Sequence, residues 1–264
     1  MDLKLKGRTA LVTGSTLGIG ASIAQTLLQE GATVLINGRD ESRTAAAAEK
    51  SKAFGDARPV AGDVSTAEGA EQVAAAALAF GDVDILVNNA GVFTPQPFFE
   101  IPDDEWERLF RVNVMSGVRM SRLLAPAMRD RGWGRVLFIA SESALNIPVE
   151  MVHYGMTKTA QLAVARGLAK TLSGTGVTVN SVLPGPTWTD GVEEFVREMA
   201  DAEGASEEQM KSDFVPKNRP TSLIQRFATA EEVASLVAYL CSDLASATSG
   251  AAMRVDGGIV DTIT

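Results

Sequence analysis

Short apolar segments alternate with longer segments of helical character along most of the chain. The apolar runs are nearly continuous, which is typical of parallel strands covered on both faces. Seven runs predict strands: Thr9–Val12, Thr33–Ile36, Val83–Val87, Arg135–Ile139 and Val177–Val182, with Arg58–Ala61 and Ala252–Val255 as weaker candidates. The segments between them predict helices: Ile19–Glu30, Ala67–Phe80, Asp103–Arg131, Tyr154–Leu172 and Ala230–Cys241, with Thr44–Ala48 as the interior of a further helix.

This repeated order of strand and helix favours one α/β fold class. It predicts a doubly wound, mostly seven-stranded parallel sheet with helices on both faces and right-handed crossovers. The length of 264 residues suits a single domain over residues 1–264 that buries its own core.

One segment does not follow this alternation of strands and helices. Residues Trp188–Ile224 show no strand pattern, carry many charges, and predict one or two short helices inserted after a strand, with a break at Val215–Pro220. The insertion either extends into solvent or forms a lid, residues 190–224, over a pocket at the carboxyl edge of the sheet. We favour the lid, because insertions at strand ends in such sheets usually line the site.

Charge and composition exclude several classes of protein. The formal net charge is −9, which disfavours binding to nucleic acid or to an anionic membrane. One cysteine and one histidine exclude a disulfide framework and a metal site with several Cys or His ligands. We see neither a secretory signal nor an apolar run of membrane-spanning length, so we expect no membrane association and a cytoplasmic location.

A glycine loop follows the first predicted strand directly. Gly14 would allow a tight turn, Gly18 a close approach of backbone to a pyrophosphate, and Gly20 close packing of helix on strand. The free N–H groups of the following helix, which begins near Ile19, favour an anion. The spacing is G-x-x-x-G-x-G, and its position between strand and helix indicates a dinucleotide site.

The end of the second strand bears on the choice of dinucleotide. A carboxylate there binds the ribose hydroxyls of NAD and repels the 2′-phosphate of NADP. Gly38 occupies that position, which we expect to leave room for the phosphate, and Arg39 offers a guanidinium to bind it, with help from Ser15 or Asn37. Arg39 could instead be a solvated residue paired with Asp40. We therefore favour NADP(H), and NAD(H) remains possible.

A tyrosine and a lysine lie four residues apart in a predicted helix. Tyr154 and Lys158 would share one helix face. A tyrosine titrates near pH 10, and an adjacent ammonium would lower its pKa toward the range useful for proton transfer. Ser141 follows the apolar strand Arg135–Ile139, at the edge where ligands sit, and its hydroxyl could hold a substrate oxygen.

Taken together, these motifs resemble the short-chain dehydrogenase/reductase family, in its compact single-domain branch. The residues that carry the resemblance cover nearly the whole chain: Thr13-Gly14-x-x-x-Gly18-x-Gly20, Asn88-Asn89-Ala90-Gly91, Asn113, Ser141, Tyr154-x-x-x-Lys158, Pro184-Gly185 and Asp256-Gly257-Gly258. The resemblance implies hydride transfer to or from a nicotinamide, with a small carbonyl or alcohol as substrate. It also implies a homotetramer, with a dimer as the next choice.

The resemblance assigns roles to individual positions. Tyr154 would be the general acid or base, Lys158 would lower its pKa and bind the nicotinamide ribose, Ser141 would hold the carbonyl oxygen, and Asn113 would support a helix kink and a water-linked proton path. No metal is expected. With the loop residues and Arg39, the expected cofactor contacts are Gly14, Ser15, Leu17, Gly18, Ile19, Arg39, Asp63, Val64, Asn89, Ala90, Gly91, Tyr154, Lys158, Pro184, Gly185, Thr187 and Thr189.

Other polar residues near the motifs have simpler expected roles. We expect Glu142 and Glu150 on the surface, and His153 in packing or solvent, because it points about 100° away from Tyr154 on a helix. Ser143 is either a second substrate contact or a strand-end hydroxyl. Four larger side chains fit a substrate wall or core packing equally well: Met151, Met156, Trp188 and Phe195.

The sequence therefore predicts an NAD(P)(H)-dependent oxidoreductase, preferring NADPH, that interconverts a ketone and a secondary alcohol. Enoyl reduction is a rival, but that branch of the wider family spaces its tyrosine and lysine farther apart. Dehalogenase relatives lose the glycine loop, which is intact here. The alternative from another class is a non-catalytic dinucleotide-sensing or scaffold protein, which would be expected to lose Tyr154, Lys158 or Ser141.

Overall fold

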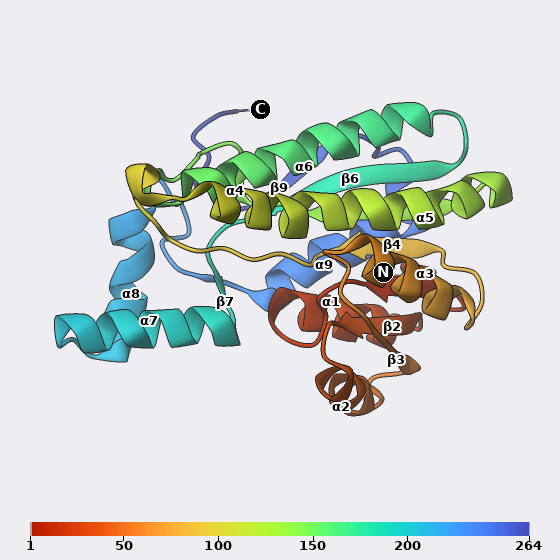
Figure 1. The fold of residues 1–264 in the computed structure, drawn as a ribbon, viewed down its shortest axis with the longest axis horizontal. Coiled ribbons are helices and arrows are strands. Elements are labelled where there is room, and N and C mark those ends of the chain that lie inside the picture. The colour runs from red at the N-terminus through yellow and green to blue at the C-terminus, as the bar shows by residue number, and fades with distance from the viewer. Residues whose placement is uncertain (1, 264) are drawn as a thin grey trace.

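A single parallel sheet forms the centre of the molecule. The computed structural model describes residues 2–263, and its strands lie in the order β3-β2-β1-β4-β5-β6-β9 (Figure 1). The strands are β1 (Thr9–Val12), β2 (Thr33–Gly38), β3 (Ala57–Ala61), β4 (Ile85–Asn88), β5 (Gly134–Ile139), β6 (Val177–Pro184) and β9 (Ala252–Val255). The order reverses between β1 and β4, and ligands of such sheets bind where the carboxyl ends of those strands diverge.

Helices cover both faces of the sheet, as the sequence predicts. One face carries α1 (Gly18–Gln29), α2 (Glu41–Ser51) and α9 (Ala230–Cys241). The other carries α3 (Ala67–Leu78), α5 (Ser116–Arg131) and α6 (Val152–Thr171) (Figure 1). The two resulting cores explain the nearly continuous apolar runs, because every position of β5 and β6 is buried.

The predicted helix Asp103–Arg131 is interrupted. The structure has α4 (Asp103–Leu109), then a π-helical segment, Phe110–Met115, and then α5. Asn113 lies in this segment and is fully buried. Its side chain donates to Val92 O and Thr157 Oγ1 and accepts from Val92 N, so the wider turn directs the amide toward Val92 and α6. The π-helical segment lies where the sequence analysis expected a helix kink.

The inserted segment forms a small unit of two helices. It contains α7 (Asp190–Glu203) and α8 (Glu207–Asn218), which project from one end of the sheet (Figure 1). A two-stranded ladder at its base pairs β7 (Thr187–Trp188) with β8 (Ala228–Thr229). Two details of the prediction are wrong: Trp188 is in a strand, and the break begins only after Asn218, because Pro216 lies within the last turn of α8.

Short 3₁₀ turns complete the described chain: Phe98–Glu100, Glu142–Ala144, Val149–Met151 and Asp243–Ala245. None of the helices described between residues 2 and 263 combines the length and apolar character that a membrane crossing needs.

Candidate active site

The glycine loop between β1 and α1 has the geometry that the motif predicts. Gly14 and Gly18 adopt left-handed conformations, with φ of 62° and 61°, which disfavour any side chain. A Cβ on Gly20 would lie 2.4 Å from Asn89 Nδ2 and 2.5 Å from Gly14 O. Leu17 precedes α1 without a side-chain cap, so the first N–H groups of a twelve-residue helix have no capping oxygen from it. These features form a cradle for an anion.

Asn89 fixes the loop against the neighbouring strand. Its Nδ2 donates to Thr13 O and Gly14 O, each at 3.0 Å. Thr13 Oγ1 in turn accepts from the backbone N–H groups of Asn89 and Ala90. The ends of β1 and β4 are therefore joined where the strand order reverses.

A cavity of about 680 Å³ runs from this loop to the inserted helices. Its walls include residues from the ends of β1, β4, β5 and β6, together with side chains from α6, α7 and α8. On the side of the insertion the walls are mainly apolar: Phe93, Met151, Val192, Phe195, Met199, Phe214 and Phe227. Phe214 stacks on Phe227 at 5.2 Å between ring centroids, which anchors α8 over the cavity.

Tyr154, Lys158 and Ser141 meet on one wall of this cavity. Lys158 lies one turn after Tyr154 on α6, with its Nζ 5.4 Å from the phenol ring centroid. The same Nζ donates to Ile139 O at 2.9 Å, which ties the lysine to the end of β5. Ser141 comes two residues later, and a hydrogen bond from its side chain favours the phenolate of Tyr154. The expected constellation is thus assembled.

Burial dominates the ionisation of this pair. It raises the pKa of Tyr154 above its usual value, and the charge of Glu142 raises it further. Burial lowers the pKa of Lys158 to about 7. A lysine that is only partly protonated at neutral pH contributes little charge, so the expected lowering of the tyrosine pKa by Lys158 is not found among the protein's own groups.

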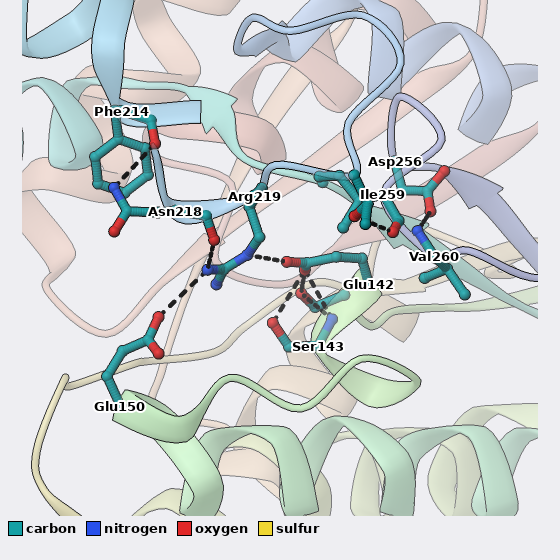
Figure 2. Close-up of polar contacts among 12 residues, drawn as sticks. Glu142, Ser143, Glu150, Phe214, Asn218, Arg219, Asp256, Ile259 and Val260 are labelled. Carbon is teal, nitrogen blue, oxygen red and sulfur yellow. Dashed lines mark hydrogen bonds and ion pairs between the residues drawn. The ribbon is translucent and has the colours of Figure 1, made fainter. Parts of the chain in front are cut away.

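Beside Ser141 lies an ionic network that the sequence analysis placed wrongly. We expected Glu142 on the surface, yet it is 3% exposed and accepts a hydrogen bond from Ser141 Oγ at 2.5 Å. Arg219, from the end of α8, donates from Nε to Glu142 Oε1 at 3.0 Å and from Nη1 to Glu150 Oε1 at 3.3 Å (Figure 2). Ser143 Oγ donates to Glu142 as well and so belongs to the network. Ser143 also lines the cavity, so a substrate contact stays open for it.

The end of β2 presents a cation and no free carboxylate. Arg39 is exposed and has no hydrogen bond or ion pair within residues 2–263. Asp40 instead caps α2, where its carboxylate accepts from Arg43 N and Ser42 Oγ, each at 2.8 Å. A Cβ on Gly38 would lie 2.6 Å from Thr16 Cγ2 and 2.8 Å from Thr44 Oγ1. The room expected at Gly38 is therefore filled by threonine side chains.

Comparison with known proteins identifies the family. A family model described as enoyl-(acyl carrier protein) reductase matches residues 14–260. An uncharacterized oxidoreductase, YvaG of Bacillus subtilis, is 47% identical over the full length of both chains, and a D-beta-hydroxybutyrate dehydrogenase of Rhizobium meliloti is 36% identical, covering 95% of this chain and 98% of its own. The crystal structure of L-sorbose reductase from Gluconobacter frateurii with NADPH and L-sorbose superposes with a TM-score of 0.95, at 33% identity, with full coverage of both chains.

The chain belongs to the short-chain dehydrogenase/reductase family. It is thus an enzyme, an NAD(P)-dependent oxidoreductase, and the alternative of a non-catalytic sensor or scaffold is set aside. The glycine cradle and the uncapped start of α1 fit the pyrophosphate of such a dinucleotide.

Most of the residues predicted for this short-chain dehydrogenase/reductase site line the cavity. They are Gly14, Leu17, Gly18, Ile19, Asn89, Ala90, Gly91, Ser141, Tyr154, Lys158, Pro184, Gly185, Thr187 and Thr189. Five do not line it: Ser15, Arg39, Asp63, Val64 and Asn113. Arg39 and Asp63 follow the ends of β2 and β3, and Asn113 lies behind the cavity wall, where its Oδ1 bonds Val92 N.

Two side chains that we expected to help bind the 2′-phosphate are already hydrogen-bonded to the backbone. Ser15 Oγ donates to Val12 O and accepts from Asn37 N. Asn37 Nδ2 donates to Val60 O and Gly62 O. Both side chains therefore hold the strands together in this structure, and the help with a phosphate that the sequence analysis expected from them stays a prediction.

Sequence reasoning missed Arg219 and several wall residues. Arg219 lies 77 residues from Glu142 in the chain, so no local pattern links them. Its neighbour Pro220 does favour an end of α8 there, since proline disfavours the helical conformation in the residue before it. Of the four large side chains left open, Met151 and Phe195 line the cavity. His153 is fully buried and packs on Trp106 at 5.7 Å, so the packing role expected for it is confirmed.

Proposed function

We propose that this enzyme interconverts a ketone and a secondary alcohol with NADP(H), and that Tyr154 is its acid and base. The observation that carries the proposal is the meeting of Tyr154, Ser141 and Lys158 on the wall of a cavity that begins at a dinucleotide-type glycine loop. When bound, the nicotinamide supplies or accepts the hydride.

The chain's own residues then have distinct tasks. In reduction, the Tyr154 hydroxyl holds the substrate oxygen, where negative charge develops, and delivers the proton to it. Ser141 Oγ, which donates to Glu142 in the structure, turns its single hydrogen to that oxygen when substrate binds. In oxidation, Tyr154 accepts the proton instead. Lys158, held by Ile139 O, faces the phenol and the cofactor ribose. Asn113 positions the segment of Val92 that borders the site.

The charges at the end of β2 support NADP(H) as the preferred cofactor. Arg39 is unpaired within the described residues, and the nearby carboxylate of Asp40 is occupied in capping α2. The L-sorbose reductase structure, which shares the fold over its full length, holds NADPH. Arg39 binds the 2′-phosphate, and Asp63 and Val64 border the adenine.

A ketone substrate is favoured over an enoyl substrate by the spacing of the catalytic pair. Tyr154 and Lys158 are separated by one helical turn, and enoyl reductases of the wider family space these residues farther apart. The description of the matching family model therefore does not fix the reaction of this chain.

The proposal also covers the oligomeric state, the cellular location and a lid over the site. The enzyme is a cytoplasmic homotetramer, with contacts along α5 and α6, as the resemblance implies. Residues 190–224 act as a substrate lid, which the apolar faces of α7 and α8 toward the cavity support.

The test is a screen of uncharged ketones and secondary alcohols with NADPH, NADH, NADP+ and NAD+. We expect turnover with NADPH, and Tyr154→Phe should keep cofactor affinity while losing turnover by roughly 10²- to 10⁴-fold, the usual range for a positioned acid–base group. Near-normal turnover by a folded Tyr154→Phe protein would show that another group transfers the proton.

A further inference from the structure

Glu142 places a buried carboxylate directly beside the position of the reacting oxygen. Its Oε2 accepts from Ser141 Oγ at 2.5 Å, from Ser143 N at 2.7 Å and from Ser143 Oγ at 3.0 Å (Figure 2). Three donors on one oxygen fix the orientation of the carboxylate. The carboxyl group is therefore held in the pocket and cannot turn out to solvent.

The cation nearest to this carboxylate is already engaged. Arg219 Nε bonds Glu142, and Nη1 bonds both Glu150 Oε1 and Asn218 O. Lys158, the other cation in the cavity wall, is bound to Ile139 O on the cofactor side. At the end of the cavity near the insertion, the carboxylates of Glu142 and Glu150 thus share the guanidinium of Arg219. The surrounding walls are mainly apolar.

We propose that Glu142, held by Arg219, is a specificity-determining residue that restricts the site to uncharged, largely apolar carbonyl compounds and excludes those with a carboxylate near the reacting carbon. This inference rests on the proposed function and names the substrate class of the same site. A substrate carboxylate would meet a fixed like charge in a pocket of low dielectric, and neither basic residue among the described lining would be free to compensate it.

Arg219 has a second role in this arrangement. An unpaired carboxylate at Glu142 would also oppose the negative charge that develops on the substrate oxygen, since only Ser141 separates the two. The ion pair with Arg219 reduces this unfavourable interaction with the developing charge. The two carboxylates, Glu142 and Glu150, still outnumber the one guanidinium, and the excess negative charge repels an anionic substrate. Because Arg219 ends α8, the balance of charge depends on the position of the insertion.

Two probes that differ by one charge test the proposal. Methyl acetoacetate and acetoacetate share the same 3-oxo group, and only the acid is anionic. Their affinities are measured with the NADP+-loaded protein, in which neither ketone can be reduced, so binding is read without turnover. We expect the wild type to bind the ester roughly ten- to a hundredfold more tightly, the effect of one like charge at several ångströms in partly screened surroundings.

Variants assign that discrimination to Glu142. Glu142→Gln should reduce the ratio of the two affinities about tenfold, whereas Arg219→Met should enlarge it, because it leaves Glu142 unpaired. Glu150→Gln, at the more exposed carboxylate, is the matched control and should change the ratio less than about threefold, because solvent screens that charge. Melting curves confirm that each variant is folded.

Three outcomes would overturn the proposal: equal or tighter binding of the acid by the wild type, an unchanged ratio in folded Glu142→Gln, or no binding of the ester. Failure of the proposed function gives a different result. In that case the NADP+ complex still discriminates between ester and acid, but no ketone is turned over with NADPH.

Discussion

Lys158 is a buried lysine whose charge the fold does not stabilise. It is 4% exposed, and burial lowers its pKa to about 7, against 10.5 for an unperturbed lysine. Between these values the unfolded chain binds the extra proton and the folded chain does not. The free energy of unfolding must therefore rise with pH across this window.

This gives a prediction for the cofactor-free protein. From pH 7 to pH 9 the free energy of unfolding should increase by about 2 kcal/mol from this group. The window stops at pH 9 because buried Cys241, with a pKa raised to about 12, contributes the opposite slope above the pKa of an unfolded thiol. Denaturant titrations measure the change.

Lys158→Met should flatten that pH dependence, and Lys170→Met, at an exposed position of the same helix, should leave it intact. An equal slope in wild type and Lys158→Met would mean that the lysine stays protonated in the folded protein.

In the proposed function, the choice of cofactor depends on Arg39. A charge-assisted hydrogen bond contributes about 1.5–3 kcal/mol, so Arg39→Ala should lower kcat/KM with NADPH by roughly 10- to 100-fold. The value with NADH should barely change. Lys50→Ala, at the exposed far end of α2, is the control. A wild type that already prefers NADH would show that Arg39 is only a solvated residue.

The structure changes one experiment suggested by the sequence. We expected Gly38→Asp to invert cofactor preference, but the new Cβ would meet Thr16 Cγ2 at 2.6 Å. The single substitution therefore tests packing as much as electrostatics. Replacing Thr16 by glycine at the same time removes the closer of the two contacts, and Thr44 Oγ1, 2.8 Å from the new Cβ, must also move.

At the scale of elements, the insertion differs from the sheet in how it is held. Its small apolar cluster consists of Val196, Ala200, Met210, Val215 and Phe227, separate from the two cores of the sheet. A unit with few buried apolar contacts opens more readily than a central strand. The end of α8 is tied to the body through Arg219 and its partners, and the residues that follow are tied through Thr221 Oγ1, which donates to Ile259 O.

Hydrogen exchange should therefore distinguish the insertion from the sheet. Amides of residues 190–224 should exchange faster than those of β5 and β6 in the free protein, and should slow when cofactor and a substrate analogue are bound. Strong protection of the insertion that is equal with and without ligand would contradict a gating role.

The elements that sequence reasoning predicted are those whose local pattern agrees with their surroundings. The apolar run of β6 is buried at every position, and Gly14 and Gly18 have the positive φ that only glycine adopts readily. The π turn at Asn113 and the burial of Glu142 depend on partners 44 and 77 residues away, Thr157 and Arg219. Their chemistry follows from tertiary contacts, which no window of neighbouring residues contains.

At the scale of the whole molecule, apolar side chains remain on the surface around the site. Phe99 is 97% exposed and Val149 84% exposed, and α6 presents partly exposed small residues such as Ala160 and Ala163. Small residues allow close helix packing, and exposed apolar groups favour association.

Light scattering at micromolar concentration should give four times the mass of the chain. Ala163→Arg, which adds bulk and charge to the exposed face of α6, should shift the protein to smaller species. Glu49→Arg, on the exposed face of α2, should not. A stable wild-type monomer would refute the tetramer and leave the fold assignment intact.

The π turn between α4 and α5 has a consequence for insertions and deletions. A π turn holds more residues than an α turn, so losing one residue from Phe110–Met115 would yield a regular, uninterrupted helix. Because the wider turn takes up the extra residue, α4 and α5 would keep their relative orientation after the deletion, but Asn113 would lose the turn that directs its amide toward Val92 and Thr157. A one-residue deletion there would not disfavour helix formation, but it would damage the site. The length of this segment is therefore more tightly constrained than its composition.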